Sequence, residues 1–201
     1  STRHTPPRLV ANDVVVISRA APADLEPCVE LTVRGFFGAL GTDYGFNNNR
    51  ATGHFELANE QRVDLLPSLA DDACLTLKAA SSGAVVGFVR VRPPRASDPR
   101  SDGLVLDNLV VDDRQRRQGI AARLMDEAEA TLRQWDAATV LLWVDEDNAD
   151  ARAFYAARGW LEEPGGRVKT SRFRITWWRG KVLEECERLA MRRVLPLAPG
   201  E

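Results

Sequence analysis

Alternating apolar and polar positions predict strands in the first half of the chain. The run Val14–Ile17 is strand-like, and the alternating segments Ala73–Lys78 and Ala84–Arg92 flank the turn residues Ser81–Gly83. Two such segments joined by a glycine-containing turn are typical of an antiparallel hairpin. The alternation returns at Leu104–Val111, which we expect to be the third strand of this antiparallel set.

Helical patterns are predicted on either side of a segment rich in glycine and asparagine. One helix opens at Pro22 and carries its last apolar residue at Phe37, and residues 38–49 predict a long flexible loop. A second amphipathic helix is predicted over about 56–66. It should stop before Pro67, because the residue that precedes a proline disfavours the helical conformation.

After Val111 the apolar spacing changes to the helical period, which predicts a long amphipathic helix that begins near Gly119. A strand over Val140–Val144 follows, and then a short helix over Ala149–Arg158 that Gly159 ends. The apolar residues that share one face of the long helix are Ile120, Leu124, Ala128, Leu132 and Trp135.

The last part of the chain, 164–201, has the least regular pattern. A helical stretch near Val182–Leu189 and a last strand near Met191–Leu195 are predicted there, after Trp177 and Trp178. The order strand, strand, strand, helix, strand, helix, strand implies a mixed α/β (α+β) sheet with helices on its faces. We expect one domain over 13–201 after a flexible polar leader over 1–12.

The composition is that of an ordinary globular protein, with 44% hydrophobic and 28% charged residues in a chain of 201. The net charge of -2, from 27 basic and 29 acidic residues, provides no bulk attraction to nucleic acid or to an anionic membrane. No apolar run approaches the roughly 20 residues needed to span a bilayer. We therefore expect neither nucleic acid nor a membrane as a partner, and a monomer or weak homodimer.

Cysteine and histidine are too sparse to suggest a metal centre. The three cysteines are far apart, without a C-x-x-C pair, and the chain has only two histidines. These numbers argue against a zinc site and against Ser-His-Asp chemistry, and they favour reduced, mostly buried thiols. The chain starts at Ser1 without a methionine, so we expect a trimmed form whose compartment its sequence leaves open.

The turn between the strand Leu104–Val111 and the long helix has the residues of a phosphate-binding loop. Its sequence is D-D-R-Q-R-R-Q-G-I-A, a basic turn that ends in a glycine at a helix start. The free N–H groups and the dipole of the first helical turn attract an anion, and Gly119 lets the backbone approach it. Arg114, Arg116 and Arg117 add positive charge. Taken alone, the same residues would also fit a surface turn with solvated arginines.

Arg116, Gly119 and Ala121 fill the pattern [Q/R]-x-x-G-x-[G/A], which resembles the acetyl-CoA pyrophosphate loop of the GNAT acetyltransferases. About thirty residues later, N-A-D-A-R-A-F-Y-A-A-R-G-W is similar to a second element of that family. Two motifs at the right separation make the resemblance specific from Leu104 to Trp160.

The resemblance implies the GNAT acyl-CoA N-acyltransferase fold, a mostly antiparallel sheet splayed between its fourth and fifth strands. It also implies acetyl-CoA as co-substrate, no metal, and direct acetyl transfer to a primary amine in a ternary complex. In the family the strand before the loop bulges and offers backbone groups to the pantetheine arm. The residues implied to bind the coenzyme are Leu109, Val110, Val111, Arg116, Arg117, Gln118, Gly119, Ile120, Ala121, Ala122, Asn148 and Tyr155.

The resemblance gives Tyr155 the role of general acid, for which a phenol with a pKa of about 10 is suited. The alternative is a core aromatic residue. For the base we favour Asp107, because residues 105, 107, 109 and 111 of one strand should share a face. An ordinary polar strand residue is an equal alternative, and Asp145 and Glu146 are rivals. Asn148 would contact the coenzyme or cap a helix.

The acceptor amine is the least determined part. The stretches R-V-D-L-L-P-S-L and L-A-M-R-R-V-L-P are similar to those of plant and algal plastid GNAT enzymes that acetylate protein N-termini and lysines. That resemblance implies a protein or peptide acceptor and the plastid stroma, and otherwise we expect a cytoplasmic enzyme. An arylalkylamine or polyamine acetyltransferase and a non-catalytic acetyl-CoA-binding regulator are the alternatives.

Overall fold

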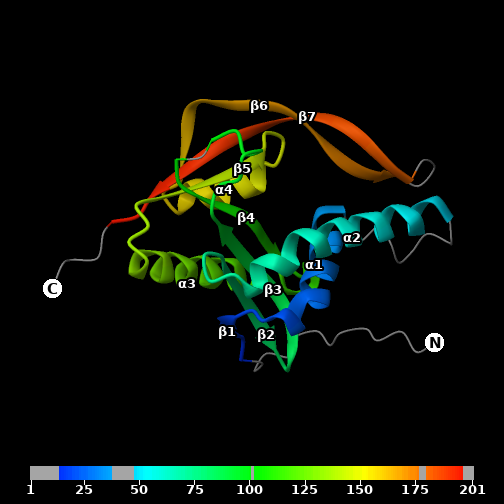
Figure 1. Cartoon of the computed structure of the whole chain (residues 1–201), viewed down its shortest axis with the longest axis horizontal. Coiled ribbons are helices and arrows are strands. Elements are labelled where there is room, and N and C mark those ends of the chain that lie inside the picture. The colour runs from blue at the N-terminus through cyan, green and yellow to red at the C-terminus, as the bar shows by residue number, and fades with distance from the viewer. Residues whose placement is uncertain (1–13, 38–47, 101, 177–179, 197–201) are drawn as a thin grey trace.

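The computed structural model describes residues 14–37, 48–100, 102–176 and 180–196. In this part of the chain seven strands form one sheet in the order β1-β2-β3-β4-β5-β7-β6 (Figure 1). All neighbours are antiparallel except β4 and β5, which confirms the expected mixed α/β architecture. The strands are β1 Val16–Arg19, β2 Leu75–Ser81, β3 Ala84–Arg92, β4 Leu104–Val111, β5 Thr139–Asp145, β6 Leu161–Thr176 and β7 Gly180–Val194.

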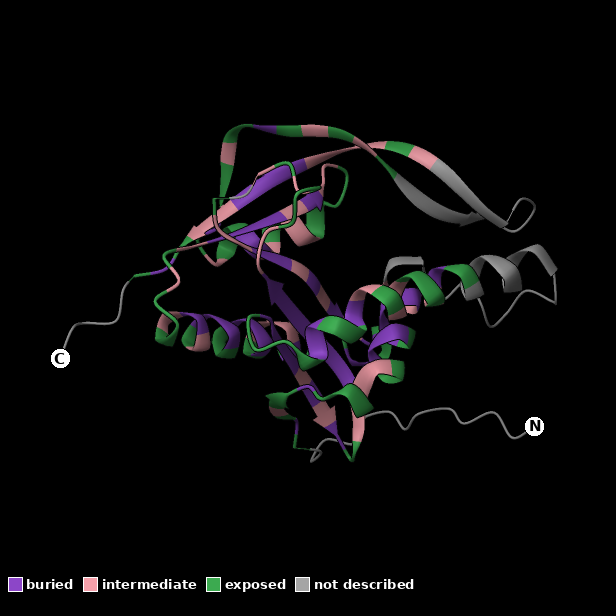
Figure 2. Ribbon diagram, viewed as in Figure 1, coloured by how far each residue is buried: buried purple, intermediate pink, exposed green. Residues whose placement is uncertain are grey.

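Helices cover both faces of the sheet, with a separate apolar core on each. The helices are α1 Leu25–Phe37, α2 Asn48–Ala70, α3 Ile120–Gln134 and α4 Ala149–Ala157. On one face Ile120 and Leu124 of α3 pack with Val89 of β3. On the other face Val29 of α1 packs with Phe88. Because successive strand residues point to opposite faces, β3 contributes to both cores, and its buried residues lie at the centre of Figure 2.

The predicted splay is present between β4 and β5. Their only pairs are Leu104–Val140, Val105–Leu141 and Leu106–Leu142. Beyond Leu142, β5 continues along β7 and pairs Trp143 with Ala190. The second half of β4 therefore has no strand partner on its β5 side.

Two predicted helix ends differ from the structure. Helix α2 passes through Pro67 and ends at Ala70, because the buried Ser68 and Leu69 hold the last turn against the protein. It begins at Asn48, so Asn48 and Asn49 are helical, and the rest of the predicted loop lies outside the described residues. In α3, Trp135 is the C-cap and is 38% exposed, so it does not extend the apolar stripe.

The predicted helix at Val182–Leu189 is wrong, because this segment belongs to strand β7. Its leucine and glutamate residues favour a helix locally. Pairing with β6 along one side and with β5 along the other outweighs that preference. The β6–β7 hairpin crosses the top of Figure 1, and α2 lies beside it. Within the described residues no helix is long and apolar enough to span a membrane.

Candidate active site

The loop between β4 and α3 is open and shaped for an anion. Arg117 and Gly119 both have positive φ angles, 64° and 77°. Gly119 is the N-cap of α3 and offers no side chain to its first-turn amides. A Cβ placed on Gly119 would meet no atom within 4 Å, so the space beside this glycine is open. The loop thus presents backbone donors to solvent, as an anion-binding helix start requires.

The arginines at this loop are distinct from the others in the described part of the chain. Arg114, Arg116, Arg117 and Arg123 form no ion pair with the described residues, although Arg116 and Arg123 each donate to a backbone carbonyl. Every other arginine whose side chain is described pairs with a carboxylate. Unpaired guanidinium groups gathered at one helix start favour a bound phosphate group. Arg123 was not among the residues that the motif indicated.

Strand β4 carries the bulge that the resemblance implied. Arg90 pairs with Asn108 and the next residue, Val91, pairs with Leu106, so Asp107 is the extra residue. Leu109 and Val111 pack toward the α3 face, whereas Val110 packs toward α1. On the splayed side, the backbone of 107–111 is available to a ligand.

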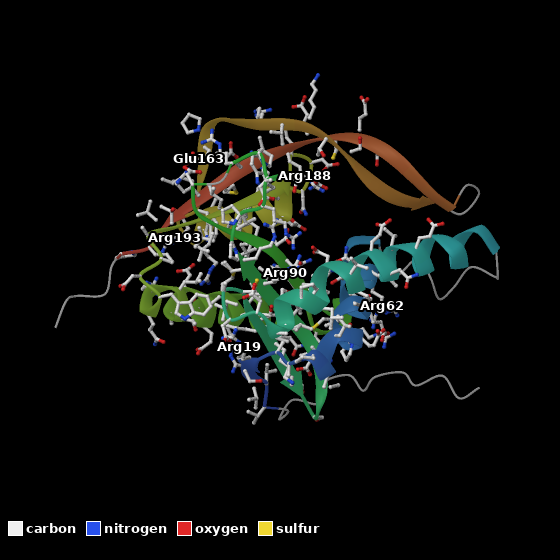
Figure 3. The ribbon with its side chains drawn as sticks, viewed as in Figure 1. Arg19, Arg62, Arg90, Glu163, Arg188 and Arg193 are labelled. Atoms are coloured by element: carbon white, nitrogen blue, oxygen red, sulfur yellow. The ribbon has the colours of Figure 1, made fainter. Side chains whose placement is uncertain are left out.

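The bulge also corrects the predicted orientation of Asp107. Its carboxylate binds Arg90, which is buried and also pairs with Asp64 of α2. Arg90 is labelled near the centre of Figure 3. Asp107 therefore points toward the α2 face, opposite to Leu109. A bulge adds one residue to the strand, so beyond it the alternation of side chains between the two faces is shifted by one position. Asp107 and Leu109, which would share a face in a regular strand, therefore lie on opposite faces. In addition, Arg92 Nε donates to Asp107 Oδ2 at 2.9 Å.

The other two candidate bases are also in ion pairs. Arg188 Nε lies 2.8 Å from Asp145 Oδ1, and Arg167 pairs with Glu146. Both bonds of Asp107 to the described residues go to Oδ2, whereas its Oδ1 binds none of them; Glu146 likewise binds Arg167 through Oε1 alone. One oxygen of Asp107 is thus left to accept a proton.

Tyr155 lies in the same core as the end of β4 and the start of α3. Its ring is 8% exposed and lies 5.4 Å from the Phe154 ring and 5.7 Å from the Trp160 ring, measured between centroids. Burial raises the pKa of the Tyr155 phenol above its ordinary value of about 10. The hydroxyl donates to none of the described residues, so a protonated donor is free for a ligand.

Asn148 is the N-cap of α4, one of its predicted alternatives. Its Oδ1 accepts a hydrogen bond from Ala151 N at 3.1 Å. This bond supports the helix that carries Tyr155. The structure brings Leu109, Val111, Ile120 and Tyr155 into one core, and Ala121 and Ala122 follow in the first turn of α3. In the described part of the chain Cys28, Cys74 and Cys186 form no disulfide bond, and the first two are buried.

The ion pair between Asp64 and Arg90 leads us to expect that the protein loses stability in acid. Burial alone would raise the pKa of Asp64, but Arg90 and Arg95 outweigh it and hold that pKa below its ordinary value. A lowered pKa stabilises the fold above about pH 4, and that stability is lost as the pH falls through the folded pKa. In urea unfolding from pH 6 to 3, the wild type should lose more stability than Asp64→Asn. Equal pH dependence of the two proteins would contradict this prediction.

The sheet with one parallel pair, opened beside a basic helix start, has the fold of known N-acetyltransferase structures. The chain belongs to the acetyltransferase (GNAT) family, which it matches over residues 44–160, more than half of its length. It is therefore an acetyltransferase. It matches no curated protein sequence. Among the described residues, no group of three or more His, Cys, Asp or Glu side chains is arranged to hold a metal ion.

Three solved structures illustrate the similarity. PaiA N-acetyltransferase from Thermoplasma acidophilum, in complex with coenzyme A, is 16% identical with a TM-score of 0.64, covering 90% of this chain and 99% of that one. Ribosomal-protein-alanine N-acetyltransferase from Brucella melitensis is 21% identical with a TM-score of 0.63, at 90% and 99% coverage. The ribosomal-protein-S18-alanine N-acetyltransferase from Escherichia coli is 17% identical with a TM-score of 0.61, at 92% and 97% coverage. At these identities the likeness shows the fold.

Members of the family use acetyl-CoA, and the site has features that fit this molecule. The open helix start with its unpaired arginines fits a diphosphate. The unpaired half of β4 fits the amide groups of a pantetheine arm. Tyr155 belongs to the same apolar core as Leu109 of β4 and Ile120 of α3.

Proposed function

We propose that this protein transfers the acetyl group of acetyl-CoA directly to a primary amine of a protein, an N-terminal α-amine, a lysine, or both. The observation that carries the proposal is the α3 start, where Gly119 leaves the first turn without a side-chain cap and the nearby arginines have no carboxylate partner in the described part of the chain. Arg116, Arg117, Gln118, Ala121 and Ala122 belong to the same segment and would surround the diphosphate.

Tyr155 is the general acid of the proposed reaction. The coenzyme supplies the acetyl group as a thioester. Burial keeps the phenol protonated at neutral pH, and its unbonded hydroxyl holds the proton that the departing sulfur requires. No cysteine falls within either motif, which favours direct transfer over an acyl-enzyme route.

Asp107 is our candidate for the base. A lysine amine has a pKa of about 10.4 and an α-amine about 8, so either must lose a proton before it attacks. The free Oδ1 of Asp107 supports this role, and the Arg90 and Arg92 guanidinium groups orient the carboxylate through Oδ2. Asp145, the last residue of β5, and Glu146, which follows it, remain the rivals, and each forms an ion pair with an arginine.

The protein acceptor is supported by two of the similar structures, whose names specify ribosomal-protein alanine. The resemblance of R-V-D-L-L-P-S-L and L-A-M-R-R-V-L-P to plastid enzymes supports both amine types and the plastid stroma as the compartment. Imaging a fluorescent fusion in algal or plant cells tests that compartment.

Expression in a bacterial host followed by mass spectrometry of its acetylated peptides tests the acceptor. New acetylated N-termini or lysines are expected with the wild type and not with Tyr155→Phe. Turnover of serotonin or spermidine without any peptide product would instead favour a small-amine enzyme. Tight acetyl-CoA binding without turnover on any amine would favour a regulator.

Gly119→Ala is expected to weaken acetyl-CoA binding about tenfold, the equivalent of one lost hydrogen bond to a charged group. The alanine strains a backbone with φ of 77° and places a methyl group where the diphosphate would lie. Gly83→Ala is a matched control, because Gly83 has φ of 80° and equally open space, but it lies in the β2–β3 turn. Titration calorimetry should find binding reduced only in Gly119→Ala. Equal affinity of the two variants would contradict the assignment of the loop.

A further inference from the structure

The proposed diphosphate loop contains two carboxylates of its own. Asp112 and Asp113 directly precede Arg114, and each accepts a hydrogen bond from Arg114 N at 3.0 Å. Asp112 is 8% exposed and is fixed further by its own N–H, which donates to Val86 O at 2.9 Å. Negative charges at this place would repel a diphosphate and would compete with it for the neighbouring arginines.

Arg34 of α1 binds both carboxylates. Its Nη2 lies 3.2 Å from Asp112 Oδ1, 3.3 Å from Asp112 Oδ2 and 3.2 Å from Asp113 Oδ1. The Arg34 side chain is 29% exposed, so these pairs are partly shielded from solvent. Its Nη1 also lies 3.6 Å from Oε1 of Glu30, whose side chain is 72% exposed. Arg34 therefore reaches the coenzyme loop from the helix layer on the opposite face to α3.

The position of Arg34 is fixed by close packing of α1 on β4. The next residue, Gly35, lies against Val110, and a Cβ on Gly35 would approach Val110 Cγ1 to 2.7 Å. Arg34 is thus held above the end of β4, where the loop begins. A larger residue at Gly35 would move α1 away from this strand.

We infer that Arg34 is a positioning residue for the coenzyme: it binds Asp112 and Asp113, offsets part of their negative charge, and so keeps Arg114, Arg116 and Arg117 available to the diphosphate. The two carboxylates lie in the same turn as these arginines, yet the arginines form no ion pair with described residues. The inference rests on the proposed function, namely that this loop binds acetyl-CoA.

Arg34→Gln is expected to raise the Kd for acetyl-CoA about tenfold, because one unit charge near the phosphate site is lost and two carboxylates are released. At saturating acetyl-CoA, kcat should stay within about twofold of the wild type, because Arg34 does not touch the reacting atoms. Arg34→Lys keeps the charge but lacks the planar guanidinium group, so its Kd for acetyl-CoA should lie between those of the wild type and Arg34→Gln.

Asp113→Asn in the Arg34→Gln background tests whether the effect comes from charge. The double variant should recover most of the lost affinity, and Asp113→Asn alone should bind at least as tightly as the wild type. Arg62→Gln is the control for the docking of α1, because Arg62 Nε pairs with Glu26 Oε1 of α1 at 2.7 Å, away from the loop. The Kd of Arg62→Gln for acetyl-CoA should equal that of the wild type.

Titration calorimetry on the folded variants gives a clear decision. If the wild type does not bind acetyl-CoA, the proposed function itself fails. If the wild type binds but Arg34→Gln binds equally well, or Asp113→Asn restores nothing, or Arg62→Gln loses as much, the inference about Arg34 is overturned.

Discussion

Tyr155→Phe is expected to lower kcat about 100-fold, the lower end of what a general acid contributes. The change removes only a hydroxyl that is bonded to none of the described residues, so the packing with Phe154 and Trp160 is kept. The KM for acetyl-CoA should change by no more than about threefold. Because burial raises the phenol pKa, the wild type should keep its kcat at pH 9.

The control for this prediction is Phe154→Leu, which reduces packing and leaves the phenol intact. Steady-state kinetics and thermal unfolding should separate the two variants. Tyr155→Phe should lose rate but not stability, and Phe154→Leu should lose stability, with kcat lowered far less. If Tyr155→Phe turns over at the wild-type rate, Tyr155 is a core aromatic residue and another group protonates the sulfur.

Arg90→Met is expected to destabilise the protein by about 3 kcal/mol, because it leaves two partly buried carboxylates without the cation between them. Arg90 is 1% exposed and pairs with both Asp64 and Asp107. For a chain of this length, that loss corresponds to a fall in Tm of about 6–12 °C.

An exposed pair provides the comparison for Arg90. Arg19 and Asp72 lie 3.3 Å apart with side chains 46% and 103% exposed, and Arg19→Met should cost no more than about 1 kcal/mol. In the triple variant Arg90→Met, Asp64→Asn, Asp107→Asn, most of the lost stability should return, because neither carboxylate remains charged. Arg92 keeps its pair with Asp98, and Arg95, which loses Asp64, is 45% exposed to solvent. A triple variant as unstable as Arg90→Met would show that packing, not charge, is the cause.

The elements with strong local patterns could be predicted from the sequence. Strands β3 and β4 have the predicted bounds, and α3 begins where Gly119 indicated. The motif residues also converge, since Leu109, Ile120 and Tyr155 share one core. In each of these cases hydrophobic period and turn residues are sufficient, because both act over a few neighbouring positions.

Features that depend on distant contacts could not be predicted. The glutamates of β7 form a strand only because β5 and β6 flank it, and the long strand β6 has no local pattern that indicates it. The bulge at Asp107 depends on its pairing with β3, so the face on which Asp107 lies was predicted wrongly. The contact between Arg34 and Asp112 joins residues 78 positions apart, and no local spacing signals it.

The parting of β4 from β5 also affects how the fold is held together. Among the described residues, the pairs at Leu104, Val105 and Leu106 are the only strand pairing that joins the two halves of the sheet, so few backbone hydrogen bonds connect them. Under the proposed function, the coenzyme would bind between the two halves of the sheet and hold them together. At a concentration one hundred times its Kd, it would add about 2.7 kcal/mol to the stability of the native state. The enzyme would then be most fragile when acetyl-CoA is scarce.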